Sequence, residues 1–338
     1  MEAIIKPAYE TKRLKLSEVL PLDTPYRITV SPTHLCNLKC FYCTHSLDKR
    51  EVEKTGFKYR DMKFDEFKQL ADQLLEFPHR LKLMIFSGMG EPLLNKDFPK
   101  MIGYAKRNKV AERIEMYSNA TLLNPELTHK LIDAGLDEFK ISIEGLDAPK
   151  YKEVGKVNID YSKFLKGIEY FYSNRGNCKI YIKIIDAALE EGGEQNFYDI
   201  FGGMCDYIYI EHLSDCQPLT GDCEGRVNKA KTMYGEDAIK TKICPMLFYS
   251  IYADADCNIY PCVTLALPVS FSIGNFRDTK IIDMWNGAKV KQLRLTHLKG
   301  NKDSIPVCRE CGNMICMYHK EDDLDDDAER LTDLYGGG

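Results

Sequence analysis

The chain lacks the features that mark membrane, exported or nucleic-acid-binding proteins. It contains one tryptophan and no run of about 18 apolar residues, so no membrane-spanning helix is expected. Its first residues, Met1–Lys6, do not have the charged and then apolar pattern of a signal peptide, so we expect a cytoplasmic protein. The 46 basic residues are outnumbered by 51 acidic ones, and the net charge of −5 argues against a nucleic-acid partner.

Disulfide bonds are not expected either, although the chain holds 13 cysteines. Reducing compartments keep thiols free, so a cysteine-rich chain without an export signal is more often a metal protein. The 338 residues, of which 44% are hydrophobic, can bury one large domain or one large and one small domain. The spacing of the cysteines is therefore the first place to look for chemistry.

Short runs of β-branched and aromatic residues alternate with helical patterns between residues 26 and 211. Alternation of this kind predicts an α/β fold with a parallel sheet, and six units form a partial (β/α)6 barrel rather than a complete TIM barrel. Apolar residues recur at intervals of three and four in the helices. The predicted strands are Tyr26–Ser31, Lys82–Ser87, Arg113–Ser118, Glu138–Ile143, Lys179–Ile185 and Tyr207–Glu211, and the predicted helices are Phe64–Phe77, Phe98–Lys106, Pro125–Ala134 and Ser162–Tyr172.

Polar motifs follow the predicted strands, each at the point where a strand ends. A cysteine-rich loop follows the first strand, and the sequence Gly-Met-Gly-Glu-Pro at residues 88–92 follows the second. Barrels of this class build their active sites at the carboxyl ends of their strands. We therefore expect the motifs to meet at one site. The later strands end in Ser118 and Asn119, in Ser142 and Glu144, and in Glu211 and His212.

The most informative motif is the cysteine loop, in which Cys36, Cys40 and Cys43 have the spacing C-x3-C-x2-C. An iron–sulfur cluster normally takes four cysteine thiolates. Three clustered ligands with no fourth nearby indicate a [4Fe–4S] cluster with one iron left open to a small ligand. A structural zinc site is the alternative that the cysteines alone leave open.

This spacing, with the aromatic Tyr42 before the last cysteine, resembles that of the radical S-adenosylmethionine (SAM) enzymes. The resemblance covers about residues 25–215 and implies that the open iron binds SAM. The family has a glycine–glutamate–proline motif that binds the SAM amino group. Its counterpart here reads GMGEP, which implies that Gly88, Gly90 and Glu91 make that contact.

Further contacts to SAM are implied at later strand ends. Residues 117–123 are similar to the TNGTLL strand end of the family, and Ser142-Ile-Glu144-Gly145 is similar to its SLDG or SIDG strand end. A ribose diol favours a carboxylate acceptor, so Glu144 suits the ribose; the alternative is that Ser142 and Glu144 only cap a strand. Lys183 could pair with the SAM carboxylate or be a solvated lysine. The implied cofactor residues are Tyr42, Gly88, Gly90, Glu91, Ser118, Asn119, Ser142, Glu144 and Lys183.

A second set of four cysteines has the spacing C-x17-C-x45-C-x2-C. Such a set can complete a four-thiolate site for zinc or for an iron–sulfur cluster. The surrounding sequence resembles the SPASM and twitch extensions of radical SAM proteins, and the cysteine count implies one auxiliary [4Fe–4S] cluster. Cys257 or Cys316 could replace one of the ligands. The four implied ligands are Cys244, Cys262, Cys308 and Cys311.

The chain is therefore expected to have four parts. An N-terminal extension at residues 1–24 precedes the radical SAM barrel at 25–215. The auxiliary-cluster domain at 216–320 is followed by an acidic tail at 321–338, which its charge predicts to be mobile.

The resemblance implies reductive cleavage of SAM to a 5′-deoxyadenosyl radical, with a flavodoxin or ferredoxin as electron donor. The single-cluster spacing resembles that of 2-deoxy-scyllo-inosamine dehydrogenase. It therefore implies oxidation of a hydroxyl group on a carbohydrate-like substrate, with the auxiliary cluster taking the electron. Glu211 or His212 could remove the hydroxyl proton, and Cys216 or Cys223 could donate a hydrogen atom to a substrate radical.

Three alternatives stay open. Epimerisation or dehydration of a sugar or nucleotide sugar would use the same fold. Peptide maturation is a second alternative, although the first 25 residues are too short for a leader-recognition domain, so a leader-binding partner would be needed. A zinc-stabilised binding protein is the alternative that is not an enzyme, and it predicts no turnover of SAM.

Overall fold

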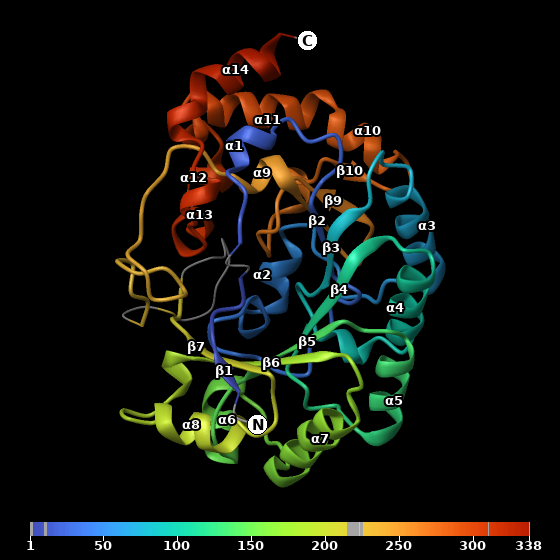
Figure 1. Ribbon diagram of the computed structural model, residues 1–338, viewed down its shortest axis with the longest axis vertical. Coiled ribbons are helices and arrows are strands. Elements are labelled where there is room, and N and C mark those ends of the chain that lie inside the picture. Colours follow the sequence, from blue (N-terminus) through green and yellow to red (C-terminus); the bar gives the residue numbers. More distant parts are fainter. Residues whose placement is uncertain (1–2, 10–11, 215–222, 224–225, 310, 338) are drawn as a thin grey trace.

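The computed structural model describes residues 3–9, 12–214, 223, 226–309 and 311–337, and one ten-stranded sheet organises them (Figure 1). The strand order is β1-β7-β6-β5-β4-β3-β2-β8-β9-β10. Strands β2 to β7 are parallel and confirm the six strands expected from the sequence. They are β2 (Arg27–Val30), β3 (Leu81–Phe86), β4 (Ala111–Ser118), β5 (Glu138–Ile143), β6 (Lys179–Ile185) and β7 (Tyr207–Glu211).

Helices between these strands follow one another along the outside of the curved sheet (Figure 1). In the first of them, Phe67, Leu70 and Leu74 are buried at intervals of three and four. Its first turn is capped by Glu66, whose carboxylate accepts a hydrogen bond from the backbone N–H of Lys63 at 2.8 Å. The predicted helices are confirmed as α3 (Phe64–Leu74), α4 (Phe98–Arg107), α5 (Pro125–Asp133) and α7 (Tyr161–Asn174), whereas α6 (Ala148–Gly155) and α8 (Glu194–Phe201) were not predicted.

The sheet extends beyond the six predicted strands on both sides. The N-terminal segment adds β1 (Ile4–Ile5), which pairs in parallel with β7, and the hydroxyl of Tyr181 donates to the carbonyl of Lys6 at 3.2 Å. On the other side, β8 (Ser250–Ala253) pairs in parallel with β2. The auxiliary region is thus joined to the barrel through continuous sheet. Its last two strands are β9 (Asn258–Tyr260) and β10 (Gly274–Asn275).

The acidic tail is folded, and the prediction that it is mobile is wrong for residues 321–337. Helix α14 (Ala328–Gly336) lies along α11 (Ala288–Leu298) at the top of the molecule (Figure 1). Leu331 is fully buried, and the carboxylate of Asp322 forms an ion pair with Arg13. Apolar residues that alternate with the acidic ones therefore hold the segment in place. The shorter helices are α1 (Leu16–Val19), α2 (Lys49–Glu53), α9 (Met246–Tyr249), α10 (Ile281–Asn286), α12 (Pro306–Arg309) and α13 (Asn313–Cys316).

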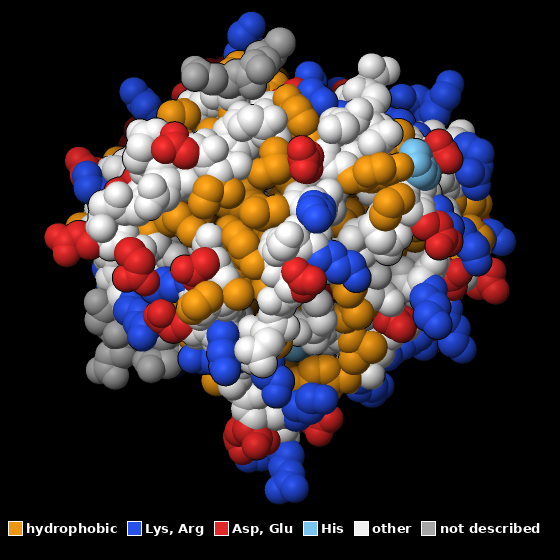
Figure 2. Space-filling model, turned by 90° about the horizontal axis from the view of Figure 1, so that it is seen from below, with side chains coloured by type: hydrophobic (Ala, Val, Ile, Leu, Met, Phe, Trp, Pro, Cys, Tyr) orange, Lys and Arg blue, Asp and Glu red, His pale blue; other side chains and the backbone are white. Residues whose placement is uncertain are grey.

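Figure 2 shows the lower end of the molecule, where apolar side chains gather in the middle and charged ones surround them. Helices α6, α7 and α8 lie at this end (Figure 1). A groove beside α7 and α8 is lined in part by Tyr161, Leu165, Ile200 and Met204. Within the described residues, no helix combines the length and apolar character needed to cross a membrane.

Candidate active site

The cysteine loop follows β2 at the carboxyl edge of the sheet. Its backbone is held by α6, since the N–H groups of Lys39 and Phe41 donate to the carbonyls of Gly155 and Val154 at 2.8 and 3.0 Å. Burial raises the pKa of the Cys36 thiol to about 12, and the neighbouring Cys43 adds to the rise. Cys40 is buried and Cys36 and Cys43 are partly buried. Three neighbouring thiols fit a site for three irons, because a metal binds the thiolate form and binding releases the protons.

Two residues expected to contact SAM meet beside this loop. The hydroxyl of Tyr42 donates to both carboxylate oxygens of Glu144, each at 2.8 Å. Glu144 follows β5 and is 3% exposed, and burial raises the pKa of its carboxyl group against the opposing effect of Tyr42. Glu144 therefore does more than cap a strand, because it joins the cysteine loop to the end of β5. Ser142 on β5 has no hydrogen-bond partner for its hydroxyl among the described residues.

Lys183 on β6 is a partly buried member of the same site rather than a solvated lysine. Its ammonium forms an ion pair with the Glu211 carboxylate at the end of β7 and lies 5.6 Å from the centre of the Tyr117 ring. Burial lowers the pKa of Lys183, but Glu211 and Tyr117 outweigh this effect and leave it raised. Glu144 acts on Lys183 as well. Glu211 is thus engaged by a cation, which makes it a weaker candidate for the base.

The GMGEP loop needs its glycines because protein atoms leave no room for side chains. A Cβ on Gly88, whose φ is +129°, would lie 2.9 Å from the side chain of Ser31. A Cβ on Gly90 would lie 2.4 Å from the carbonyl oxygen of Thr33. Such distances are too short for real carbon atoms, so the loop lies directly against the segment that carries the cysteines.

Glu91 follows the glycines of this loop and is hydrogen-bonded within the protein. Its carboxylate accepts hydrogen bonds from the Ser118 hydroxyl at 2.6 Å, from the N–H of Asn119 at 2.8 Å and from the N–H of Leu93 at 3.0 Å. It is 3% exposed. Protein donors hold the carboxylate, so Glu91 positions the end of β4, and its contact with SAM stays a prediction.

An amide network extends this positioning to the cysteine loop. The side-chain amide of Asn119 donates to Asn37 at 2.9 Å, and that of Asn37 donates to Thr121 at 2.8 Å. Asn37 lies directly after Cys36 in the chain. Ser118 and Asn119 thus connect the GMGEP loop to the cluster loop, and sequence reasoning identified both of them but missed Asn37.

His212 is oriented by a carboxylate that the sequence analysis did not identify. Its Nδ1 lies 2.8 Å from Oδ2 of Asp186, and the other oxygen of Asp186 accepts from the N–H of Leu213 at 2.9 Å. Asp186 follows β6, so its place after a predicted strand was the available signal. Of the two candidate hydrogen donors, Cys223 is half-buried against the barrel core, and Cys216 lies outside the described residues.

The four auxiliary cysteines line one small cavity, together with apolar neighbours such as Leu247 and Val307. Burial raises the pKa of Cys262 to about 11 and that of Cys308 to about 12, and the thiols act on one another. A cavity with four thiols in its walls fits a four-thiolate cluster. The cysteines that meet there are Cys244, Cys262, Cys308 and Cys311.

The two alternative ligands lie elsewhere. Cys257 is buried in the barrel core near Arg60 and Arg277, and its backbone has a left-handed φ of +69°. Cys316 is close to Cys311 but lines a neighbouring cavity. Within the described ranges, no three His, Cys, Asp or Glu side chains converge closely enough for a single metal ion. A cubane of four irons is wider than one ion, so its ligands need not meet at a point.

Two family models match the chain. The radical SAM superfamily matches residues 30–192, and the iron–sulfur cluster-binding domain named SPASM matches residues 244–312. The chain belongs to the radical SAM superfamily. It is accordingly a radical SAM enzyme with a C-terminal SPASM region. Its cofactors are SAM, the [4Fe–4S] cluster of the superfamily and one or more auxiliary iron–sulfur clusters in the SPASM region.

The chain spans less than half the length of the curated relatives that it matches. A protein named probable GTP 3',8-cyclase from Methanococcus maripaludis is 39% identical over 145 residues, which are 43% of this chain and 44% of that protein. A PqqA peptide cyclase from Granulibacter bethesdensis is 29% identical over 145 residues, which are 43% of this chain and 36% of that protein.

Solved structures share the fold over most of the chain. BtrN, in complex with AdoMet and 2-DOIA, is 18% identical, with coverage of 88% of this chain and 96% of its own and a TM-score of 0.54. SuiB of Streptococcus suis, bound to the precursor peptide SuiA, is 16% identical, with coverage of 82% and 68% and a TM-score of 0.60. These likenesses confirm the expected fold class, a partial barrel with a C-terminal SPASM region.

Proposed function

We propose that the enzyme oxidises a hydroxyl group of a carbohydrate-like substrate and that one auxiliary [4Fe–4S] cluster takes up the electron. The observation that carries the proposal is the cavity walled by the four cysteines of the SPASM region. Four thiolates fill the ligand positions of a [4Fe–4S] cluster, so no iron is left for a substrate. A closed cluster can still accept an electron, and oxidation requires such an acceptor, whereas epimerisation and dehydration do not.

The protein's share of the chemistry is to hold and orient the reacting groups. Cys36, Cys40 and Cys43 would hold the radical SAM cluster. Bound SAM and this cluster supply the radical that removes a hydrogen atom from a substrate carbon. Ser142, whose hydroxyl has no partner within the described residues, and the Glu144 carboxylate offer polar groups to the cofactor at the end of β5.

The chain must also remove the hydroxyl proton. Conversion of a secondary alcohol to a ketone releases one hydrogen atom from carbon, one proton from oxygen and one electron, and the last two go to a base and to the auxiliary cluster. His212 is the best-placed base, because Asp186 binds its Nδ1 and leaves Nε2 to accept the proton. Glu211 is held in its ion pair with Lys183.

The test is turnover by the anaerobically reconstituted enzyme with SAM, dithionite and a panel of aminocyclitols, sugar phosphates, nucleotide sugars and short peptides. We expect 5′-deoxyadenosine to form with a carbohydrate and the product to be lighter by about 2 Da. Unchanged product mass with deuterium gained from solvent would replace oxidation by epimerisation, and turnover of a peptide alone would replace the substrate class. Dithionite stands in for the flavodoxin or ferredoxin that we propose as the electron donor.

Two variants separate the residue roles. His212→Gln is expected to lower kcat by a factor of about 100 or more, as loss of a general base does. Cys223→Ser is the matched control, since a dehydrogenase needs no hydrogen donor and keeps its activity without this thiol. Loss of activity in Cys223→Ser with His212→Gln unaffected would reverse the assignment.

A further inference from the structure

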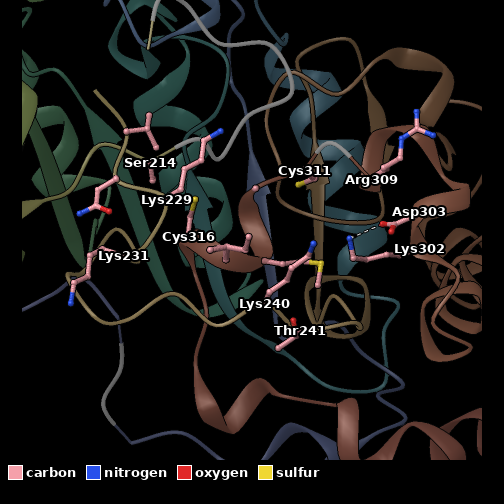
Figure 3. A pocket seen from close by; sticks show the side chains of 15 residues that line it. Ser214, Lys229, Lys231, Lys240, Thr241, Lys302, Asp303, Arg309, Cys311 and Cys316 are labelled. Carbon is pink, nitrogen blue, oxygen red and sulfur yellow. Dashed lines mark hydrogen bonds and ion pairs between the residues drawn. The ribbon is translucent and has the colours of Figure 1, made fainter. Parts of the chain in front are cut away.

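A basic cavity lies between the end of β7 and the auxiliary cysteines. It has a volume of about 430 Å³, opens to solvent and extends from Ser214, just after β7, to Cys311 (Figure 3). Five cationic side chains and one carboxylate line it, although the whole chain has a net charge of −5. The charged residues are Lys229, Lys231, Lys240, Lys302, Arg309 and Asp303.

Carboxylates neutralise only part of this charge. The ammonium of Lys302 binds Asp303 at 3.0 Å, and that of Lys231 binds Asp237 at 2.7 Å. Within the described residues, Lys229 and Lys240 form no ion pair. The cavity therefore keeps an excess of positive charge.

We propose that this cavity binds the phosphate or diphosphate group of the substrate, which makes the substrate a phosphorylated carbohydrate. The proposal rests on the proposed function, because it takes the substrate to be a carbohydrate. Several cations around one concave space match the charge of a phosphate group. The cavity begins two residues after His212 and ends at an auxiliary ligand. A phosphate bound there would hold the attached sugar between the base and the electron acceptor.

The experiment measures binding of inorganic pyrophosphate and of UDP to the reconstituted holoenzyme by titration calorimetry at two salt concentrations. Wild-type enzyme is expected to bind both probes, and more weakly at the higher salt concentration. Lys229→Glu and Lys240→Glu are each expected to weaken binding by about tenfold or more, as loss of a charged contact does. Lys163→Glu, an exposed site on α7, is the matched control and is expected to leave binding unchanged.

Other outcomes overturn the proposal. Absence of pyrophosphate and UDP binding, or equal binding by all variants, would refute it. Charge reversal that slows reduction by flavodoxin and leaves pyrophosphate binding intact would make the cavity a docking face for an acidic electron carrier. Formation of 5′-deoxyadenosine from SAM and dithionite in the presence of the carbohydrate panel is measured in parallel. Its absence would contradict the proposed function, and the binding data would then stand separately.

A different observation concerns His297 on α11, which lines the cavity of the four auxiliary cysteines. The side chain is fully buried. Its Nδ1 accepts a hydrogen bond from the backbone N–H of Cys244 at 3.2 Å, so the ring proton of the neutral imidazole is on Nε2. Among the described residues, Nε2 has no hydrogen-bond partner. Buried donors are nearly always satisfied, so a missing acceptor is indicated.

We infer that His297 donates its Nε2–H to a sulfur atom of the auxiliary cluster and raises the reduction potential of that cluster. Hydrogen bonds to cluster sulfurs stabilise the more negative, reduced state. His297 is then a positioning and tuning residue for the electron acceptor and not one of its ligands. This inference needs the cluster on the four cysteines but does not depend on the identity of the substrate.

The readout is the midpoint potential of each cluster, measured by EPR-monitored redox titration. His297→Leu is expected to make reduction of the auxiliary cluster about tenfold less favourable, which is a shift of about 59 mV to lower potential for one electron. His297→Gln, which keeps an N–H donor, is expected to recover most of the shift. The radical SAM cluster in the same protein is the internal control, and its potential is expected to stay constant.

Wild-type protein containing 15N-histidine provides a test that does not require a variant to fold. A weak 15N coupling to the reduced auxiliary cluster in pulsed EPR is expected for a hydrogen bond. A strong coupling would show that His297 is a ligand, and no coupling would show that it does not contact the cluster. Either of these outcomes, or an unchanged potential in an iron-replete leucine variant, overturns the inference.

Discussion

The substitution Glu91→Gln tests whether Glu91 acts through the protein or contacts SAM. In the structure, one carboxylate oxygen accepts from Ser118 and Leu93, and the other accepts from the N–H of Asn119. The glutamine amide can keep the first oxygen, but its NH2 group would then face the Asn119 N–H, which is buried. An unsatisfied buried donor costs about 1 to 3 kcal/mol, so we expect the free energy of unfolding to fall by about 2 kcal/mol.

The assay is urea unfolding without SAM, followed by SAM binding to the folded variant. Glu169→Gln, an exposed change on α7, is the matched control and is expected to stay within about 0.5 kcal/mol of the wild type. Unchanged stability in Glu91→Gln together with a SAM affinity at least about tenfold weaker would refute the reasoning. That result would return Glu91 to the direct SAM contact that the family resemblance implies.

Three further predictions address the cluster ligands, the base and the tail. Cys262→Ala is expected to lose the auxiliary cluster, measured as about four irons per chain, whereas Cys257→Ala is expected to keep it. Asp186→Asn is expected to lower kcat by a factor of about 100 or more without unfolding the protein, because the imidazole loses its orienting carboxylate. Leu331→Ala is expected to lower the free energy of unfolding by about 2 to 5 kcal/mol, measured by denaturant titration, because Leu331 is fully buried.

Each of these has an outcome that contradicts it. Equal iron loss in the two cysteine variants would end the assignment of the four-cysteine cavity. Full kcat in Asp186→Asn would remove the histidine–carboxylate pair from the reaction. Leu334 is 48% exposed. If Leu331→Ala lowered the free energy of unfolding no more than Leu334→Ala does, α14 would not pack as described.

The barrel could be predicted from the sequence because each strand and helix has a pattern of apolar residues within its own short segment. Strand Glu138–Ile143 and helix Phe98–Arg107 carry their periodicity within a few residues, and the structure begins and ends them within one residue of the prediction. The pairing of β8 with β2 was not predicted, because it joins residues that lie more than 200 positions apart and leaves no local pattern. The prediction of a mobile acidic tail was wrong because it was made from net charge alone. The segment is held by the buried side chains of Leu331 and Tyr335.

The site divides in the same way. Cys36 and its two partners, and the GMGEP loop, could be recognised because their chemistry is compressed into short motifs. Asp186 and His297 could not, since each is a single ordinary residue whose role comes from a neighbour on another element. Glu91 and Ser118 were both found but their hydrogen bond was not, because a sequence motif names a residue and does not show which way its carboxylate points.

The pairing of β8 with β2 also has a consequence for how the protein is made. Strand β2 leaves the ribosome early, but the residues that cover one of its edges, Ser250–Ala253, are synthesised more than 200 residues later. At a typical rate of protein synthesis of about 5 to 20 residues per second, that edge of β2 stays unpaired for at least about 10 seconds. An open edge invites pairing with other chains. Nascent chains released before residue 250 should therefore aggregate readily, and high expression should depend on chaperones that shield this edge.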